Sequence, residues 1–170
     1  ERVVVPSTRE AEPLRADSWF WRYLALGGVA GGLLAWIGVR ATTGARLFRV
    51  LFGTLASAWS LLAGLSGLIL VLVLLTDHWS MTFNESLFLL NPVSLPLVAL
   101  VPLALRGSLA SARRARMLGF VALGVAALGL LFQLLPVTPQ ETGMLFALLL
   151  PIHIGLAMAL NAVAEVEPRA

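Results

Sequence analysis

Long runs of apolar residues separated by short polar connections dominate the chain. A helix that crosses a membrane needs about 20 predominantly apolar residues. Five runs approach or exceed this length, at residues 21–39, 50–75, 86–105, 117–135 and 142–163. The second run is long enough to predict a helix that tilts within the bilayer. The pattern therefore predicts an all-α integral membrane bundle of five transmembrane helices.

The first predicted span has a glycine pattern suited to close helix packing. Gly27 with Gly31, and Gly28 with Gly32, form two overlapping G-x-x-x-G pairs. Such pairs allow two helix backbones to approach closely in a membrane. These four glycines are therefore candidates for a tight helix contact, although glycine is also common in membrane helices generally.

The third predicted span is interrupted by Pro92, Pro96 and Pro102. Each proline lacks a backbone N–H and leaves the carbonyl one turn earlier without its helical partner. Inside a bilayer these carbonyls must find partners within the bundle. We therefore expect this span to be kinked or partly broken.

Arginine counting predicts the orientation of the bundle. The connection at 40–49 carries three arginines and the connection at 106–116 carries four, whereas the other two carry none. By the positive-inside rule, the arginine-rich connections are cytoplasmic. Five spans then place the N-terminus outside and the C-terminus in the cytoplasm. Residues 19–164 form the membrane domain and residues 165–170 a cytoplasmic tail.

The polar segment 1–18 precedes the first span. It holds two prolines, four acids and three arginines, which is typical of a linker or of the tail of an upstream periplasmic domain. A frayed terminus is the alternative. The chain begins with Glu1 and lacks a signal-peptide pattern, so we expect that it is processed or belongs to something longer.

Composition supports the membrane class and limits the chemistry. The chain is 59% hydrophobic and 12% charged, whereas a soluble domain is about a quarter charged. Its arginines lie mainly at the ends of apolar runs, which argues against a nucleic-acid partner. The absence of cysteine excludes a cysteine nucleophile and thiolate metal sites within this chain. We identify no catalytic residues, no metal site and no cofactor.

The polar chemistry gathers in residues 76–92, between the second and third runs. The candidates for a substrate-binding or domain-docking site are Asp77, His78, Asn84, Glu85 and Asn91. Asp77 and His78 either act on a lipid headgroup or polar substrate, or are two solvated residues that end a helix. A triad with Ser80 is not supported, because neighbours in sequence seldom adopt the required geometry.

Structural roles compete with function for the remaining polar residues. Thr82 and Glu85 have the spacing of a capping box. Asn84 and Asn91 lie seven apart on one helical face, where they either satisfy freed carbonyls or line a polar notch. His153, near the middle of the fifth span and close to Pro151, is either a functional group or a neutral histidine bonded to a freed carbonyl.

The motif TDH-x5-NE-x-L-x3-NP carries a resemblance to a known family. It comprises Thr76, Asp77, His78, Asn84, Glu85, Leu87, Asn91 and Pro92. Gly64-Leu65-Ser66-Gly67 and an aliphatic run precede it, and Gln140 and a proline-bearing last span follow it. With these features, residues 19–163 resemble the membrane domain of Lnb-type bacterial proteins, which are similar to lipoprotein N-acyltransferases.

The resemblance implies a place in a larger enzyme. Family members pair a periplasmic papain-like domain, with a Cys and a His, with a C-terminal multi-span domain. That Cys and His have no counterpart here and would lie upstream of Glu1. The resemblance therefore implies a bacterial inner-membrane location, and acyl transfer from phospholipid to an exported lipoprotein by the full protein.

Two hypotheses follow from this resemblance and from the residues. In the first, the chain is the membrane anchor and lipid-presenting domain of an envelope acyltransferase, with membrane phospholipid and an upstream periplasmic domain as partners. In the second, it is a non-catalytic accessory subunit that packs against partner membrane subunits through its glycine faces. A small transporter is less favoured, because the five spans show no obvious repeat and few intramembrane charges.

Overall fold

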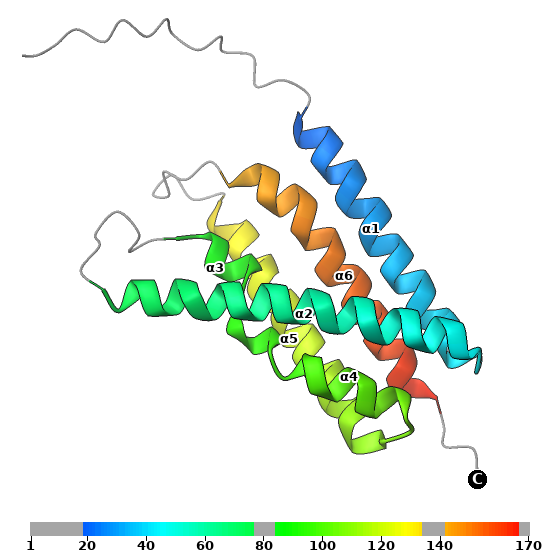
Figure 1. The fold of residues 1–170 in the computed structure, drawn as a ribbon. Helices are drawn as coiled ribbons and strands as arrows, with labels where there is room; N and C mark the ends of the chain where they lie inside the picture. The colour runs from blue at the N-terminus through cyan, green and yellow to red at the C-terminus, as the bar shows by residue number, and fades with distance from the viewer. Residues whose placement is uncertain (1–18, 77–83, 134–141, 167–170) are drawn as a thin grey trace, which may run out of the picture.

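The computed structural model describes residues 19–76, 84–133 and 142–166, and within them the chain is entirely helical (Figure 1). The helices are α1 (Trp19–Thr42), α2 (Arg46–Leu74), α3 (Ser86–Leu89), the 3₁₀ turn η2 (Pro92–Ser94), α4 (Leu97–Leu105), α5 (Leu109–Phe132) and α6 (Gly143–Glu165). Four of them are long and apolar enough to cross a membrane, and the bent pair formed by residues 86–94 and 97–105 makes a fifth span. The five-span all-α prediction is confirmed.

The third span is broken, as its prolines predict. Its two halves meet at an angle of 56°. α3 ends at Leu89, η2 begins with Pro92, and α4 begins directly after Pro96. Pro102 lies inside α4 without ending it. The first half packs against α5 and α2, and the second half against the same two helices nearer their other ends.

The arginine-rich segment 106–116 is mostly helix, which corrects the prediction of a long connection. Only residues 106–108 join α4 to α5. Gly107 turns the chain with φ +98°, a conformation that favours glycine. Ser108 then caps α5, because its hydroxyl accepts a hydrogen bond from the Ser111 N–H at 3.3 Å. Arginine is itself a good helix former, so Arg113 and Arg116 extend α5 rather than interrupt it.

α1 and α6 pack side by side along much of their length (Figure 1). Gly27 and Gly31 face α6 so closely that an added Cβ would overlap the backbone of Leu148 or Pro151. Gly155 of α6 in turn lies against the backbone of Gly31. The pair Gly27 and Gly31 therefore forms the close contact that a G-x-x-x-G pattern predicts.

The second glycine pair does not take part in this contact. No heavy atom lies within 4 Å of a Cβ placed on Gly28 or Gly32, and both residues are exposed. Adjacent residues on a helix point in different directions, so one pair faces α6 and the other faces away. Packing by Gly28 and Gly32 against another protein stays a prediction.

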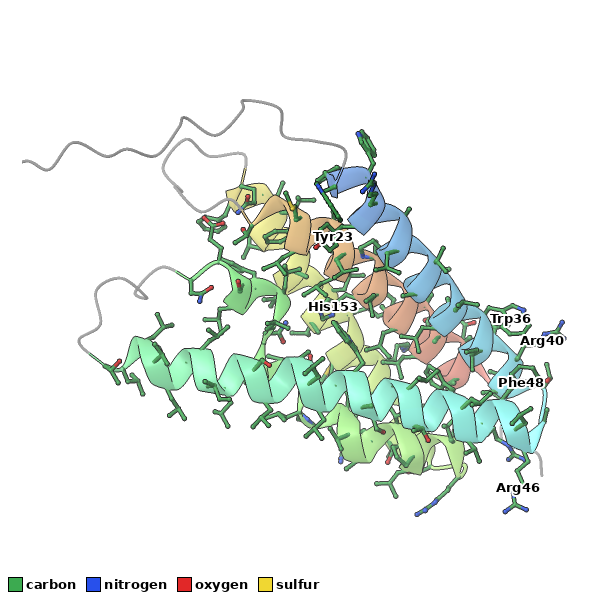
Figure 2. The ribbon with its side chains drawn as sticks, turned by 45° about the horizontal axis from the view of Figure 1, so that its top comes forward. Tyr23, Trp36, Arg40, Arg46, Phe48 and His153 are labelled. Atoms are coloured by element: carbon green, nitrogen blue, oxygen red, sulfur yellow. The ribbon has the colours of Figure 1, made fainter. Side chains whose placement is uncertain are left out.

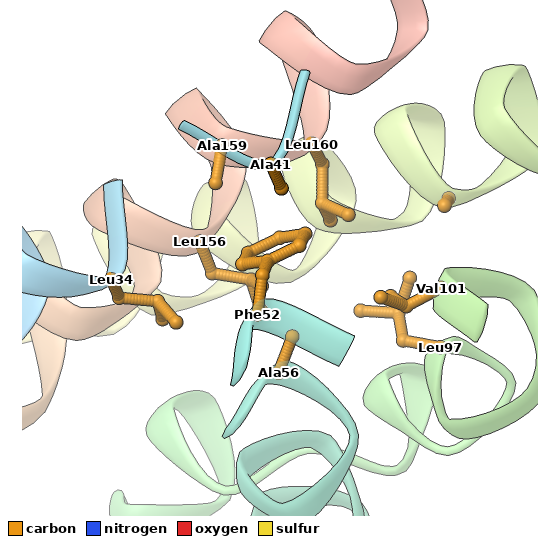
Figure 3. Packing of buried hydrophobic residues seen from close by; sticks show 10 residues of the cluster. Leu34, Ala41, Phe52, Ala56, Leu97, Val101, Leu156, Ala159 and Leu160 are labelled. Atoms are coloured by element: carbon orange, nitrogen blue, oxygen red, sulfur yellow. The ribbon is translucent and has the colours of Figure 1, made fainter. Parts of the chain in front are cut away.

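The core of the bundle surrounds Phe52 of α2 (Figure 3). Leu34 and Ala41 of α1, Leu97 of α4 and Leu156 of α6 are buried in the same cluster. The outer faces of the helices instead carry exposed large apolar side chains, as lipid-facing helices do.

The two arginine-rich segments lie at one end of the bundle. A recess there is lined by Gly44 and Arg49 from the first segment, Arg106 and Ser108 from the second, and Val163 of α6. Figure 2 shows Arg40 and Arg46 at this end. Both segments thus share one side of the membrane, as arginine counting requires. Which side that is stays a prediction, because the fold fixes only which ends lie together.

Candidate functional site at the end opposite the arginines

Glu85 lies at the centre of a polar cluster built from three helix ends. It directly precedes α3 and is only 5% exposed. Its Oε2 accepts a hydrogen bond from the side-chain amide of Gln133 and another from the Thr142 hydroxyl, at 2.9 Å for the second. The Gln133 amide also donates to the Thr142 hydroxyl oxygen at 2.7 Å. We call Glu85, Gln133 and Thr142 the glutamate cluster.

The cluster ties together segments that are distant in sequence. Gln133 is the last described residue at the end of α5, and Thr142 immediately precedes α6. The N-terminal end of a helix carries a partial positive charge, so the start of α6 favours a carboxylate beside Thr142. A buried carboxylate needs such hydrogen bonds because it has left water. The cluster therefore fixes the ends of α3, α5 and α6 relative to one another.

The capping box of Thr82 and Glu85 stays a prediction. α3 begins at Ser86, so Glu85 takes the N-cap position of α3, where its side chain accepts no hydrogen bond from the first N–H groups of that helix. The capping bond comes from Asn84, whose Oδ1 accepts the Ser86 N–H at 3.0 Å. The carboxylate is left to reach across the bundle to α5 and α6. Thr82, the other half of the proposed box, lies outside the described residues.

Asn91 has a structural partner of its own. It is 3% exposed, and its Nδ2 donates to the Phe88 carbonyl at 3.3 Å. Phe88 precedes Pro92 by four residues, so this is the carbonyl that Pro92 leaves without a helical donor. The interpretation that an asparagine satisfies a freed carbonyl is thus confirmed for Asn91. Asn84 instead caps α3, so the two amides do not share one role.

The other polar groups of the break have similar roles. His153 of α6 is buried in the bundle (Figure 2), and its Nε2 lies 2.8 Å from the Leu89 carbonyl oxygen at the end of α3. A carbonyl only accepts, so Nε2 carries the proton. Ser57 of α2 donates to the Val98 carbonyl at 3.2 Å, which is the carbonyl that Pro102 frees.

His153 therefore bonds a free carbonyl, as one of its two interpretations predicts. The carbonyl belongs to Leu89 in the broken span, however, and not to the turn of α6 that contains Pro151. The ring also meets the Trp59 indole of α2 edge-on, with 5.6 Å between centroids. His153 joins three helices at the break, and this accounts for an ionisable residue at such depth.

Asp77 and His78 lie outside the described residues, so their functional assignment stays a prediction. The last described residue before them is Thr76, whose hydroxyl donates to the Val73 carbonyl at 2.7 Å at the end of α2. No group of three potential metal ligands occurs within 19–76, 84–133 and 142–166.

Sequence reasoning missed Gln133 and Thr142 as partners of Glu85. Each is a single polar residue at the end of an apolar run, and that position was the only available signal. The cluster contains no cysteine and no histidine. Its carboxylate, amide and hydroxyl are suited to holding helix ends in place and to hydrogen bonding with a polar ligand or protein surface.

Comparison with known families agrees with this architecture. The family model described as the Lnb transmembrane domain matches residues 25–164, which run from α1 almost to the end of α6. No curated protein and no solved structure matches the chain. The match includes both glycines that face α6, the broken span and the glutamate cluster. The chain therefore belongs to the Lnb transmembrane domain family and is a multi-pass membrane protein with a five-helix membrane domain.

Proposed function

We propose that this domain anchors an envelope acyltransferase in the bacterial inner membrane and presents phospholipid to it for the acylation of exported lipoproteins. The acyl group would leave a phospholipid ester and form an amide with the lipoprotein's terminal amine, releasing the lipid alcohol. In this proposal the nucleophile would be the cysteine of a periplasmic domain, as the family resemblance implies, because these 170 residues include no cysteine. The membrane domain would position that domain and its lipid.

The glutamate cluster is the observation that carries this proposal. It fixes the ends of three helices at the end of the bundle opposite the arginines. Arginine counting predicts that this end of the bundle lies on the outer side of the membrane. A catalytic domain that acts on lipid at the outer surface needs a rigid docking platform there, because small misplacements of reacting groups are costly. Glu85 would hold this platform, with Asp77, His78 and Asn84 in its surface.

The test compares variants of the intact protein in a strain whose lipoprotein acylation depends on it. Glu85→Ala removes the acceptor for Gln133 and Thr142, so we expect acylation to fall by about tenfold or more, while Glu85→Gln keeps an acceptor oxygen and retains more activity. Glu165→Ala is the control, because that exposed acid bonds only locally to Asn161. Mass spectrometry of a lipoprotein's N-terminal peptide measures the acylation.

Two results would contradict this assignment. Normal acylation with Glu85→Ala at wild-type protein levels would show that the cluster has no part in the reaction. His78→Ala and Asn84→Ala test the surrounding surface, and normal acylation in both would remove these residues from the site. Comparing membrane levels of every variant separates a loss of function from a loss of protein.

A second function is favoured by the outward glycine face of α1. Gly28 and Gly32 have open space around them, and Val29 and Leu33 beside them are exposed. A partner helix could approach this face closely, as in an accessory subunit of a larger assembly. Co-purification of other subunits in fixed ratio, lost on Gly28→Leu and Gly32→Leu, would support this alternative. An unchanged subunit composition in the variants would exclude this face as the interface.

A further inference from the structure

Two recesses meet at the arginine end of the bundle. The larger, of about 700 Å³, is an open groove between α2 and α4, lined by Arg46, Arg49, Val50, Gly53, Thr54, Ser57, Val98, Pro102, Leu105 and Arg106. The smaller, of about 360 Å³, lies between the helix ends and is lined in part by Thr42, Gly107 and Ala112. Arg49 and Arg106 line both. We call the larger recess the arginine groove.

The arginine groove has a charged mouth and a mainly apolar body. Along α2 it extends from Arg46 to Ser57, eleven residues or roughly 16 Å at the rise of an α-helix. This length is close to the depth of one leaflet, about half of the roughly 30 Å hydrocarbon core. At the far end of the groove, the Ser57 hydroxyl donates to the Val98 carbonyl, so both polar groups are paired. Its dimensions therefore match an extended acyl chain that starts at the membrane surface.

Among the described residues, no acid lines either recess at the mouth. Glu85 and Glu165 are the only acidic residues among those that the structure describes. Glu85 belongs to the cluster at the other end, and Glu165 bonds Asn161 and lines neither recess. Arg49 donates one hydrogen bond to the Gly44 carbonyl at 2.9 Å, which orients its guanidinium and leaves further N–H donors.

We propose that the arginine groove binds an anionic phospholipid from the leaflet on the arginine side. The phosphodiester would lie between Arg49 and Arg106, where the two recesses meet, with Arg46 adding positive charge. Guanidinium groups suit phosphate oxygens because their planar donors match them in pairs. One acyl chain would occupy the groove between α2 and α4. This site is separate from the outer surface proposed above and does not depend on acyltransferase activity.

Native mass spectrometry of the intact protein, purified in detergent with phosphatidylglycerol or phosphatidylcholine, tests the charge at the mouth. We expect retention of phosphatidylglycerol over phosphatidylcholine, reduced roughly 30-fold by Arg49→Gln with Arg106→Gln, as the loss of two arginines near an anionic lipid implies. Arg113→Gln with Arg114→Gln removes the same charge from α5, outside the groove, and should retain the lipid. Equal loss of phosphatidylglycerol in both double variants would mean that the net charge of the protein alone retains the lipid. That result would overturn the assignment of the lipid to the groove.

A second variant tests the body of the groove without changing any charge. Gly53 lines it, so Gly53→Leu should fill it and lower phosphatidylglycerol retention at least about fourfold, the effect of displacing one buried methylene of the acyl chain. Gly124→Leu is the control, because nothing lies within 4 Å of a Cβ at that position. Unchanged retention in Gly53→Leu would overturn the acyl-chain assignment, even if the arginine variants fail to fold. Displacement of the lipid by millimolar inorganic phosphate would show a free-phosphate site instead.

Discussion

The contact between α1 and α6 predicts different effects on stability when a methyl group is added at two adjacent glycines, Gly31 and Gly32. A Cβ added at Gly31 would lie 2.1 Å from the Pro151 carbonyl oxygen, whereas ordinary contact begins at 3.4 Å. Gly31→Ala therefore requires the two helices to separate by about 1.3 Å at this point. A gap of that size forfeits a large share of the local dispersion energy, and overpacking of this kind costs about 1–3 kcal/mol. In a membrane no hydrophobic force between helices compensates for it.

Gly32→Ala supplies the matched control. It adds the same methyl group one residue later, where no heavy atom lies within 4 Å. Any gain in helix propensity is shared by both variants, so the difference between them isolates the packing. Reversible unfolding in mixed detergent micelles measures the two free energies of unfolding. We expect Gly31→Ala to be destabilised relative to Gly32→Ala by about 1–3 kcal/mol. Equal stabilities would refute the close contact, and a larger loss at Gly32 would place the packing face on the opposite side of α1.

Three further predictions concern the backbone of the bundle, and unfolding in the same micelles checks each of them. Ser57→Ala removes the donor to the Val98 carbonyl and should cost about 0.6–1.7 kcal/mol, while a neutral result would show that another group satisfies this carbonyl. His153→Phe keeps an aromatic ring but leaves the Leu89 carbonyl without its donor, and it should cost about 1–3 kcal/mol. His153→Gln restores a donor and should recover part of this loss. Equal stability of the wild type and both variants would contradict the hydrogen bond. Gly107→Ala forces a left-handed backbone on alanine and should cost about 1–2 kcal/mol, and tolerance without loss would mean that the turn adopts another conformation.

Much of the fold could be predicted because a bilayer restricts the options. With no water to bond the backbone, apolar runs of sufficient length must be helices, and their number is therefore readable from the sequence. The break in the third span could be predicted for the same reason, since Pro92 and Pro96 remove backbone donors that a continuous helix needs. The length of the α4–α5 connection cannot be predicted from arginine positions, because arginines stand at the ends of apolar runs but also extend a helix.

The partners of the polar residues could not be predicted, because they depend on how helices face one another. Helical periodicity indicates that Gly27 and Gly28 point in different directions, but not which of them meets another helix. The same limit applies to His153. Pro151 beside it suggested a carbonyl in its own helix, whereas the helix packing brings the Leu89 carbonyl to the ring instead. The Glu85 cluster combines residues 48 and 57 positions apart, a separation for which the sequence pattern holds no signal.

The polar residues of this chain divide according to whether the backbone needs them. Asn91, Ser57 and His153 each donate to a carbonyl left by the broken span, so helix chemistry explains the donor groups of all three. Glu85 instead accepts hydrogen bonds from Gln133 and Thr142 across the bundle while it is almost fully buried. Burial of a carboxylate is costly, and a neutral residue would have closed the helix ends with less penalty. The fold keeps a buried acid at this cost and with partners on two other helix ends, and this places Glu85 ahead of Asn91 as the position from which to examine how the Lnb membrane domain acts.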